Sequence, residues 1–127
     1  MTTPISVVKT AYEAYGRGDV NAILDLVADQ VDWKMVGPPQ IPYTGQRNNK
    51  AEVASFFAQL AQADDTEIFE PREFIESGEH VVVLGYLRGT TRPEGKLVET
   101  EWLHIFTVVD GKIRRWKGFA DTSIRFL

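Results

Sequence analysis

The hydrophobic pattern of this chain changes from helical to strand-like near Thr66. Beyond that point apolar and polar residues alternate, and short turns interrupt them at residues 77–79, 92–95 and 110–111. Four strands are predicted, over residues 66–76, 80–92, 96–109 and 112–121. Because no helix separates them, these strands must be antiparallel neighbours in one sheet.

The first half of the chain begins with two predicted helices. Thr3 followed by Pro4 is a helix start, and apolar residues recur at helical spacing from there until Gly16. Asp19 can cap a second, shorter helix, whose apolar side extends to Val27.

A strand, a long loop and a third helix are predicted next. Apolar and polar residues alternate over residues 31–36, as in a half-buried strand, and Gly and Pro at residues 37–39 end this strand. A loop then runs through Tyr43 and Gly45. Asn48 or Asn49 can cap the third helix, which has a broad apolar face. The class is therefore α+β, with the helices first and a meander of strands second.

Length and composition predict a single domain that spans residues 1–127. Hydrophobic residues make up 43% of the chain and charged residues 25%, which is typical of soluble globular proteins. No internal repeat or linker divides the sequence.

The charge balance and residue content exclude several classes of partner. A net charge of -4 disfavours nucleic-acid binding, and the basic patch at residues 112–117 is interpreted as a solvated strand edge. No apolar stretch approaches the length that spans a bilayer, so no membrane association is expected. The start has no signal-peptide pattern and the chain has no cysteine, which together favour a cytoplasmic location.

The predicted strand over residues 96–109 is apolar on both faces. Trp102, His104 and Phe106 share one face, while Leu103 and Ile105 share the other. A sheet that is apolar on both sides must be covered twice, by the helices of the chain on one face and by a partner on the other. A homodimer is therefore expected.

His104 is the first candidate for chemistry. It stands between two aromatic residues on a covered face, where neighbouring groups can shift the pKa of an imidazole. The structural alternative is a core histidine that is satisfied by a backbone carbonyl or a neighbouring tyrosine.

Asp121, at the end of the last predicted strand, is the second candidate. In a pair of strands that turns at Asp110-Gly111, Asp121 falls opposite Glu99 or Thr100, about two residue pairs from His104. The two side chains can meet if the register or a bulge allows. Alternatively, Asp121 caps the irregular C-terminal segment.

The sequence is rich in aromatic residues, most of which serve the core. A subset is predicted to line a pocket for a small apolar organic ligand: Trp33, Tyr43, Trp102, Tyr12 and Phe56. Only two histidines are present, without metal-ligand spacing, and no nucleophile elbow or phosphate loop is found. No metal site is predicted.

Several segments resemble the nuclear-transport-factor-2-like (NTF2-like) superfamily, which has a cystatin-like fold, and within it the SnoaL-like polyketide cyclases and relatives of ketosteroid isomerase. The resemblance covers nearly the whole chain. It is carried by four segments: Gly18-Asp19, Val31-Asp32-Trp33, residues 101–106 with 110–113, and Phe119-Ala120-Asp121-Thr122.

The resemblance implies a cone-shaped domain in which three N-terminal helices cover a strongly curved, mainly antiparallel sheet around a pocket. It also implies a homodimer, and chemistry that needs no cofactor. In SnoaL-like cyclases an Asp at the position of Asp121 takes a proton from carbon, and a His at the position of His104 lies nearby. Such a reaction needs a base and a donor to the enolate oxygen.

Three departures separate the chain from ketosteroid isomerase, one of the known examples of tuned carboxyl groups. In an ungapped alignment through Gly18-Asp19, the oxyanion-binding Tyr of that family falls at Ala11, beside Tyr12. Its base falls near Lys34 and its protonated Asp near His104. Steroid isomerisation by that machinery is therefore not expected. The resemblance to SnoaL-like cyclases implies instead a cofactor-free acid/base enzyme, an isomerase, cyclase or related lyase, acting on a small apolar carbonyl compound with Asp121 as base and His104 as donor. A non-catalytic ligand-binding or dimeric scaffold domain, and a protein-interaction module, remain the alternatives.

Overall fold

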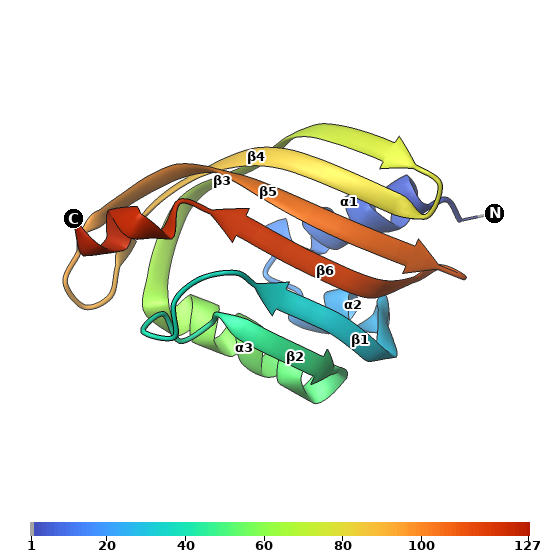
Figure 1. Cartoon of the computed structure of the whole chain (residues 1–127), viewed down its shortest axis with the longest axis horizontal. Helices are drawn as coiled ribbons and strands as arrows, with labels where there is room; N and C mark the ends of the chain where they lie inside the picture. The colour runs from blue at the N-terminus through green and yellow to red at the C-terminus, as the bar shows by residue number, and fades with distance from the viewer. Residues whose placement is uncertain (1) are drawn as a thin grey trace.

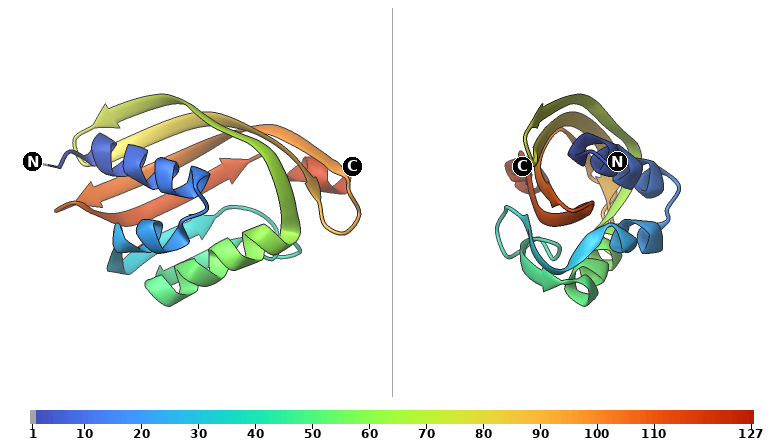
Figure 2. Two further views of the ribbon diagram at one scale, coloured as in Figure 1. Left: turned by 180° about the vertical axis from the view of Figure 1, so that it is seen from behind. Right: turned by 90° about the vertical axis from the view of Figure 1, so that its right-hand side faces the viewer.

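The computed structural model describes residues 2–127, and its three α-helices lie together on one side of a curled sheet (Figures 1 and 2). The helical elements are α1 (Pro4–Gly16), α2 (Val20–Asp25), α3 (Lys50–Ala63) and a short C-terminal 3-10 helix, η1 (Thr122–Phe126). None of the helices formed by the described residues is long and apolar enough to cross a membrane.

Six strands form one sheet in the order β2-β1-β6-β5-β4-β3. All neighbours are antiparallel except β1 and β6, which are parallel. The strands are β1 (Val27–Met35), β2 (Gly45–Asn49), β3 (Asp64–Ser77), β4 (His80–Thr91), β5 (Leu97–Val109) and β6 (Lys112–Ala120). The α+β class and the meander of the last four strands are confirmed.

Each long helix begins at a side-chain cap. Thr3 accepts a hydrogen bond from the backbone N–H of Ser6, and Asn49 accepts one from Glu52. Because such caps satisfy donors that the first turn leaves free, they fix where the helices start. Of the two predicted caps for the third helix, Asn49 is the one used.

Several boundaries differ from the sequence prediction, two of them by more than a shift at a strand end. Val27 was assigned to the second helix, but that helix ends at Asp25 and Val27 is the fully buried first residue of β1. The predicted loop through Gly45 ends in a strand, because Gly45–Asn49 pairs with β1 at the sheet edge. An edge strand has a neighbouring strand on one side only and can be polar throughout. It then does not show the alternation of apolar and polar residues by which strands are recognised in sequence.

The core lies between the helices and the concave face of the sheet. In β5, Trp102, His104 and Phe106 are buried on this face, whereas Leu103 and Ile105 on the opposite face are half-buried. Seen end-on, the sheet curls around the helices (Figure 2, right). This curvature leaves space between the two layers.

Candidate functional site

A cavity of about 130 Å³ lies between the helices and the sheet. Its wall is formed mainly by aromatic rings, and all three tryptophans of the chain belong to it. The rings come from α1 (Tyr12, Tyr15), β1 (Trp33), the β1–β2 loop (Tyr43), α3 (Phe56, Phe57), β3 (Phe69), β5 (Trp102, Phe106) and β6 (Trp116). An engineered apolar cavity of about 150 Å³ binds benzene, so this space suits a ligand with a single ring.

The seven residues predicted for the site all line this one cavity. They are Asp121, His104, Trp33, Tyr43, Trp102, Tyr12 and Phe56. They come from α1, β1, α3 and β5 and from two connecting segments, β1–β2 and β6–η1. Side chains on the concave face of a curled sheet converge, which brings them together. Their position is thus known, while their roles remain predictions.

Two glycines make room for the tryptophans of the wall. A Cβ atom on Gly85 would lie 2.1 Å from the Trp102 ring, and one on Gly118 would lie 2.5 Å from Trp116. Real Cβ atoms do not approach other atoms so closely. The absence of a side chain at these strand positions is therefore required for the indoles to lie flat against the sheet.

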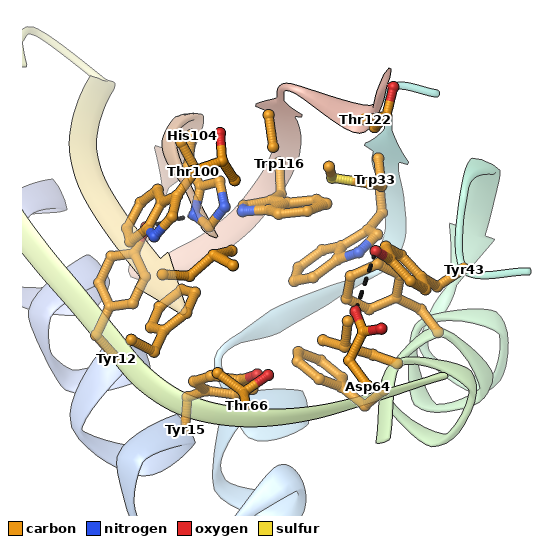
Figure 3. Close-up of a pocket in the computed structure, with 18 of the residues that line it drawn as sticks. Tyr12, Tyr15, Trp33, Tyr43, Asp64, Thr66, Thr100, His104, Trp116 and Thr122 are labelled. Atoms are coloured by element: carbon orange, nitrogen blue, oxygen red, sulfur yellow. Dashed lines mark hydrogen bonds between the residues drawn. The ribbon is translucent and has the colours of Figure 1, made fainter. Parts of the chain in front are cut away.

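His104 is buried inside an aromatic cage. Its ring stacks on Trp102 at a centroid distance of 4.1 Å, and Trp116 meets it edge-on at 4.8 Å. Its Nδ1 atom lies 2.6 Å from the hydroxyl oxygen of Tyr12. Figure 3 shows Tyr12 and His104 on the same side of the pocket.

The hydrogen bond from Tyr12 defines the state of the imidazole. Burial lowers the pKa of His104 from 6.5 to about 3, so the ring is neutral at physiological pH. Burial also raises the pKa of Tyr12, which therefore keeps its proton. Within residues 2–127, the Tyr12 hydroxyl has no hydrogen-bond acceptor other than Nδ1 of His104. Tyr12 thus donates to Nδ1, which leaves the His104 proton on Nε2 as a free donor.

Asp121 lies at the exposed rim of the cavity. A bulge between Thr107 and Val108 shifts the register of β5 and β6, so that Ala120 pairs with Trp102. The backbone N–H of Asp121 donates weakly, at 3.4 Å, to Oγ1 of Thr100, near the position predicted from the turn. The strand register therefore carries Asp121 to the cavity without burying it.

The Asp121 carboxylate makes its hydrogen bonds with η1. Its Oδ1 atom accepts from the backbone N–H of Ser123 at 3.1 Å and from the Ser123 hydroxyl at 2.5 Å. This is the capping role weighed as an alternative from the sequence. Oδ2 has no hydrogen bond within the described part of the chain.

A second polar cluster was missed from the sequence. Asp64 at the start of β3 and Arg125 in η1 form a largely buried ion pair at 2.7 Å, and Tyr43 donates to the same carboxylate at 3.4 Å. All three line the cavity. Asp64 lies just before the strand predicted from residue 66, and no local pattern marks Arg125. Their pairing joins positions 61 residues apart, so only the tertiary fold shows it.

Comparison with known proteins gives a consistent result. The chain is 28% identical to the aklanonic acid methyl ester cyclase AcmA of Streptomyces galilaeus, over 95% of this chain and 86% of AcmA. The crystal structure of an NTF2-like protein from Burkholderia pseudomallei K96243 matches with a TM-score of 0.90 and 27% identity, covering 99% of this chain and 96% of that one.

TerC, co-crystallised with polyporic acid, is a further structural neighbour. Its TM-score is 0.87 at 26% identity, and the match covers 98% of this chain and 96% of TerC. The family model of the SnoaL-like domain matches residues 8–116, which include most of the sheet and of the cavity wall. The chain therefore belongs to the family of SnoaL-like domains.

Proposed function

We propose that this protein is a cofactor-free acid/base enzyme of the isomerase or cyclase type, which moves a proton on carbon next to a carbonyl group. The observation that carries the proposal is the Tyr12–His104 hydrogen bond inside an apolar cavity with a carboxylate at its rim. Similarity to the cyclase AcmA supports the same reaction class.

In this proposal His104 polarises the carbonyl. A neutral imidazole whose Nδ1 is occupied by Tyr12 presents Nε2–H to a ligand oxygen. When a proton leaves the neighbouring carbon, negative charge develops on that oxygen, and a donor in a dry aromatic cage stabilises it more than water does. The pKa near 3 keeps His104 a donor that does not itself become charged.

Asp121 is the proposed base. Its Oδ2 atom is free of hydrogen bonds among the described residues, while the Ser123 contacts hold the carboxylate at the rim. The carboxylate takes a proton from the carbon, forming an O–H bond as the C–H electron pair becomes the enolate. It then returns the proton to another carbon or to the same one, so no external oxidant or reductant is needed.

Exchange of carbon-bound protons with solvent tests this function. The probe is phenylacetone in D2O, whose methylene group lies between a single ring and a carbonyl, and proton NMR follows the loss of the methylene signal. The wild-type protein is expected to accelerate the loss. Asp121→Asn should reduce the acceleration by about a hundredfold or more, which is the usual contribution of a general base.

The variants for this test have built-in controls. Asparagine caps helices as well as aspartate does, so Asp121→Asn keeps the contacts with Ser123 and the fold. Asp110→Asn, in the β5–β6 turn, removes an exposed carboxylate far from the cavity lining and should leave the exchange rate unchanged. Equal rates for the wild-type protein and Asp121→Asn would rule out Asp121 as the base.

A non-catalytic ligand-binding domain is the second candidate, and the exposed, η1-capping position of Asp121 favours it. A binding protein would take phenylacetone into the cavity without accelerating exchange. Because all three tryptophans line the cavity, a change in their fluorescence on binding, with exchange at the background rate, would identify this case.

We further propose that the chain forms a homodimer through the outer face of the sheet. Leu84, Leu103 and Phe119 lie in register across β4, β5 and β6 on that face. Leu84 is 36% exposed, and the other two are half-buried. An apolar row in the middle of an open sheet face is suited to a second copy of the same surface.

A further inference from the structure

The polar cluster of Asp64, Arg125 and Tyr43, called here the Asp64 cluster, lies apart from His104. Figure 3 shows Asp64 and Tyr43 on the opposite side of the pocket from Tyr12 and His104. All members of both groups line the same cavity. The cavity therefore has a polar group on each of two opposite sides.

The core of the Asp64 cluster is a two-point ion pair. Nη1 of Arg125 donates to Oδ2 of Asp64 at 2.9 Å, and Nη2 donates to Oδ1 at 2.7 Å. The side chains are only 11% and 13% exposed, respectively. A buried ion pair adds little net stability compared with apolar residues of the same size, because both charges lose their hydration. Stability alone therefore does not account for charges at this position.

The hydrogen-bonding capacity of this cluster is not exhausted. Tyr43 donates to Oδ2 of Asp64 at 3.4 Å, well beyond the usual distance of about 2.7 Å for such a bond. Burial and the nearby Asp64 raise the pKa of Tyr43 to about 12, so its proton stays available. The Arg125 guanidinium carries five N–H groups. Its only side-chain hydrogen-bond partner among the described residues is Asp64.

The charge of the cluster determines which ligand group it suits. Arg125 and Asp64 cancel, so the cluster is neutral overall, and a ligand carboxylate would lie against the carboxylate of Asp64. A hydroxyl group, by contrast, is both donor and acceptor. It can donate to Asp64 in place of the long Tyr43 bond and accept from Arg125 or Tyr43.

We propose that the Asp64 cluster is a subsite for a hydroxyl group, so that the substrate is a hydroxylated ring ketone. The carbonyl lies at His104 and the hydroxyl at the opposite end of the cavity. The position of the carbonyl rests on the proposed function, whereas the hydroxyl subsite rests on the Asp64 cluster alone.

Calorimetric titration with two matched probes tests the subsite. Phenylacetone and 4-hydroxyphenylacetone differ only by a hydroxyl group at the end of the ring away from the ketone. The wild-type protein is expected to bind the hydroxylated compound about tenfold more tightly, as one additional hydrogen bond to a charged group implies. Equal affinities, or binding of neither compound, would overturn the proposal.

A double variant removes the subsite while retaining the fold. Asp64→Leu combined with Arg125→Met replaces the ion pair by apolar side chains of similar size, an exchange that proteins usually tolerate. This variant should bind phenylacetone as the wild-type protein does and lose the tenfold preference. If the preference persists in the double variant, the hydroxyl group binds elsewhere and the proposal fails.

A single substitution with a matched control gives an independent test. Asp64→Asn should also reduce the preference, whereas Asp65→Asn should not, because Asp65 is an exposed neighbour that pairs with Arg92 at 3.7 Å. Equal effects of the two substitutions would contradict the assignment. Since these titrations measure binding only, equal affinities of the wild-type protein for the two probes, with methylene exchange intact, would refute the subsite and leave the proposed function standing. The reverse result would refute the function alone.

Discussion

The hydroxyl oxygen of Tyr12 lies 2.6 Å from Nδ1 of His104, and the two residues are 92 positions apart in the chain. One comes from the first helix and the other from the middle of the sheet. This contact links the layers of the fold at the site where we place the chemistry, and it determines which ring nitrogen of His104 carries the proton.

Tyr12→Phe is expected to lower the free energy of unfolding by about 1–3 kcal/mol, since a buried acceptor on His104 loses its donor. It should also alter the nitrogen-15 chemical shifts of the His104 ring, because Nδ1 no longer has to be the unprotonated atom. Urea unfolding and NMR measure the two effects. Tyr15→Phe is the control: its hydroxyl has no hydrogen bond in the described part of the chain, and both readouts should stay near wild type. Unchanged ring shifts in Tyr12→Phe would contradict the assigned proton position.

His104 should make the protein less stable in acid. Its pKa is about 3 when folded and 6.5 when unfolded, so between these values the unfolded chain binds the additional proton. The stabilising contribution is complete above pH 6.5 and is lost as the pH falls toward 3, at about 1.4 kcal/mol per pH unit.

Unfolding in urea at pH 7 and pH 5 measures this effect. The wild-type protein should lose about 2 kcal/mol more than His104→Gln between these pH values. His80→Gln, at the exposed second histidine, should behave as the wild type does. Identical pH dependence of the wild-type protein and His104→Gln would show that folding does not lower the pKa of His104.

Gly85→Ala should destabilise the fold and distort the cavity wall. The added Cβ would meet the Trp102 ring at 2.1 Å and the carbonyl oxygen of Glu70 at 2.6 Å, so the indole has to move. Overpacking of this kind costs about 1–3 kcal/mol. Gly16→Ala, where a Cβ meets nothing within 4 Å, should cause no loss of stability. Thermal unfolding and tryptophan fluorescence check both variants, and equal stability of the two would contradict the packing described here.

Leu103→Glu should convert the proposed homodimer into a monomer. The substitution places a charge in the middle of the apolar row on the outer face of the sheet, where a partner would bury it without a counter-ion. Leu97→Glu changes an apolar residue that is 50% exposed outside this row, and it should leave the mass in solution unchanged. Light scattering that gives a monomeric mass for the wild-type protein would contradict the proposed dimer.

The sheet was predictable because its signals are local. Alternating residues and short turns after Thr66 specify the meander without reference to the rest of the chain. Strand β2 was not predictable, because Gly45–Asn49 is polar and becomes a strand only by pairing with β1. Propensity gives no signal where the partner strand decides the conformation.

The residues of the site also fall into those that the sequence predicts and those that only the tertiary fold shows. His104 and Asp121 stand out because a polar group among apolar neighbours, or at the end of a strand, is unusual in sequence. The pairing of Asp64 with Arg125 is set by how η1 returns across the start of β3, and no spacing rule predicts it. The bulge at Thr107 likewise shifts the register in a way that turn geometry alone does not give.

The central claim is that a ligand carbonyl binds at His104, and the vibrational frequency of that carbonyl tests it most directly. Infrared spectra of phenylacetone labelled with carbon-13 at the carbonyl would be recorded in the wild-type protein and in His104→Leu. A hydrogen bond from Nε2 should lower the stretching frequency in the wild-type complex below its value in cyclohexane, and His104→Leu should restore the cyclohexane value. The same frequency in both proteins would contradict the account.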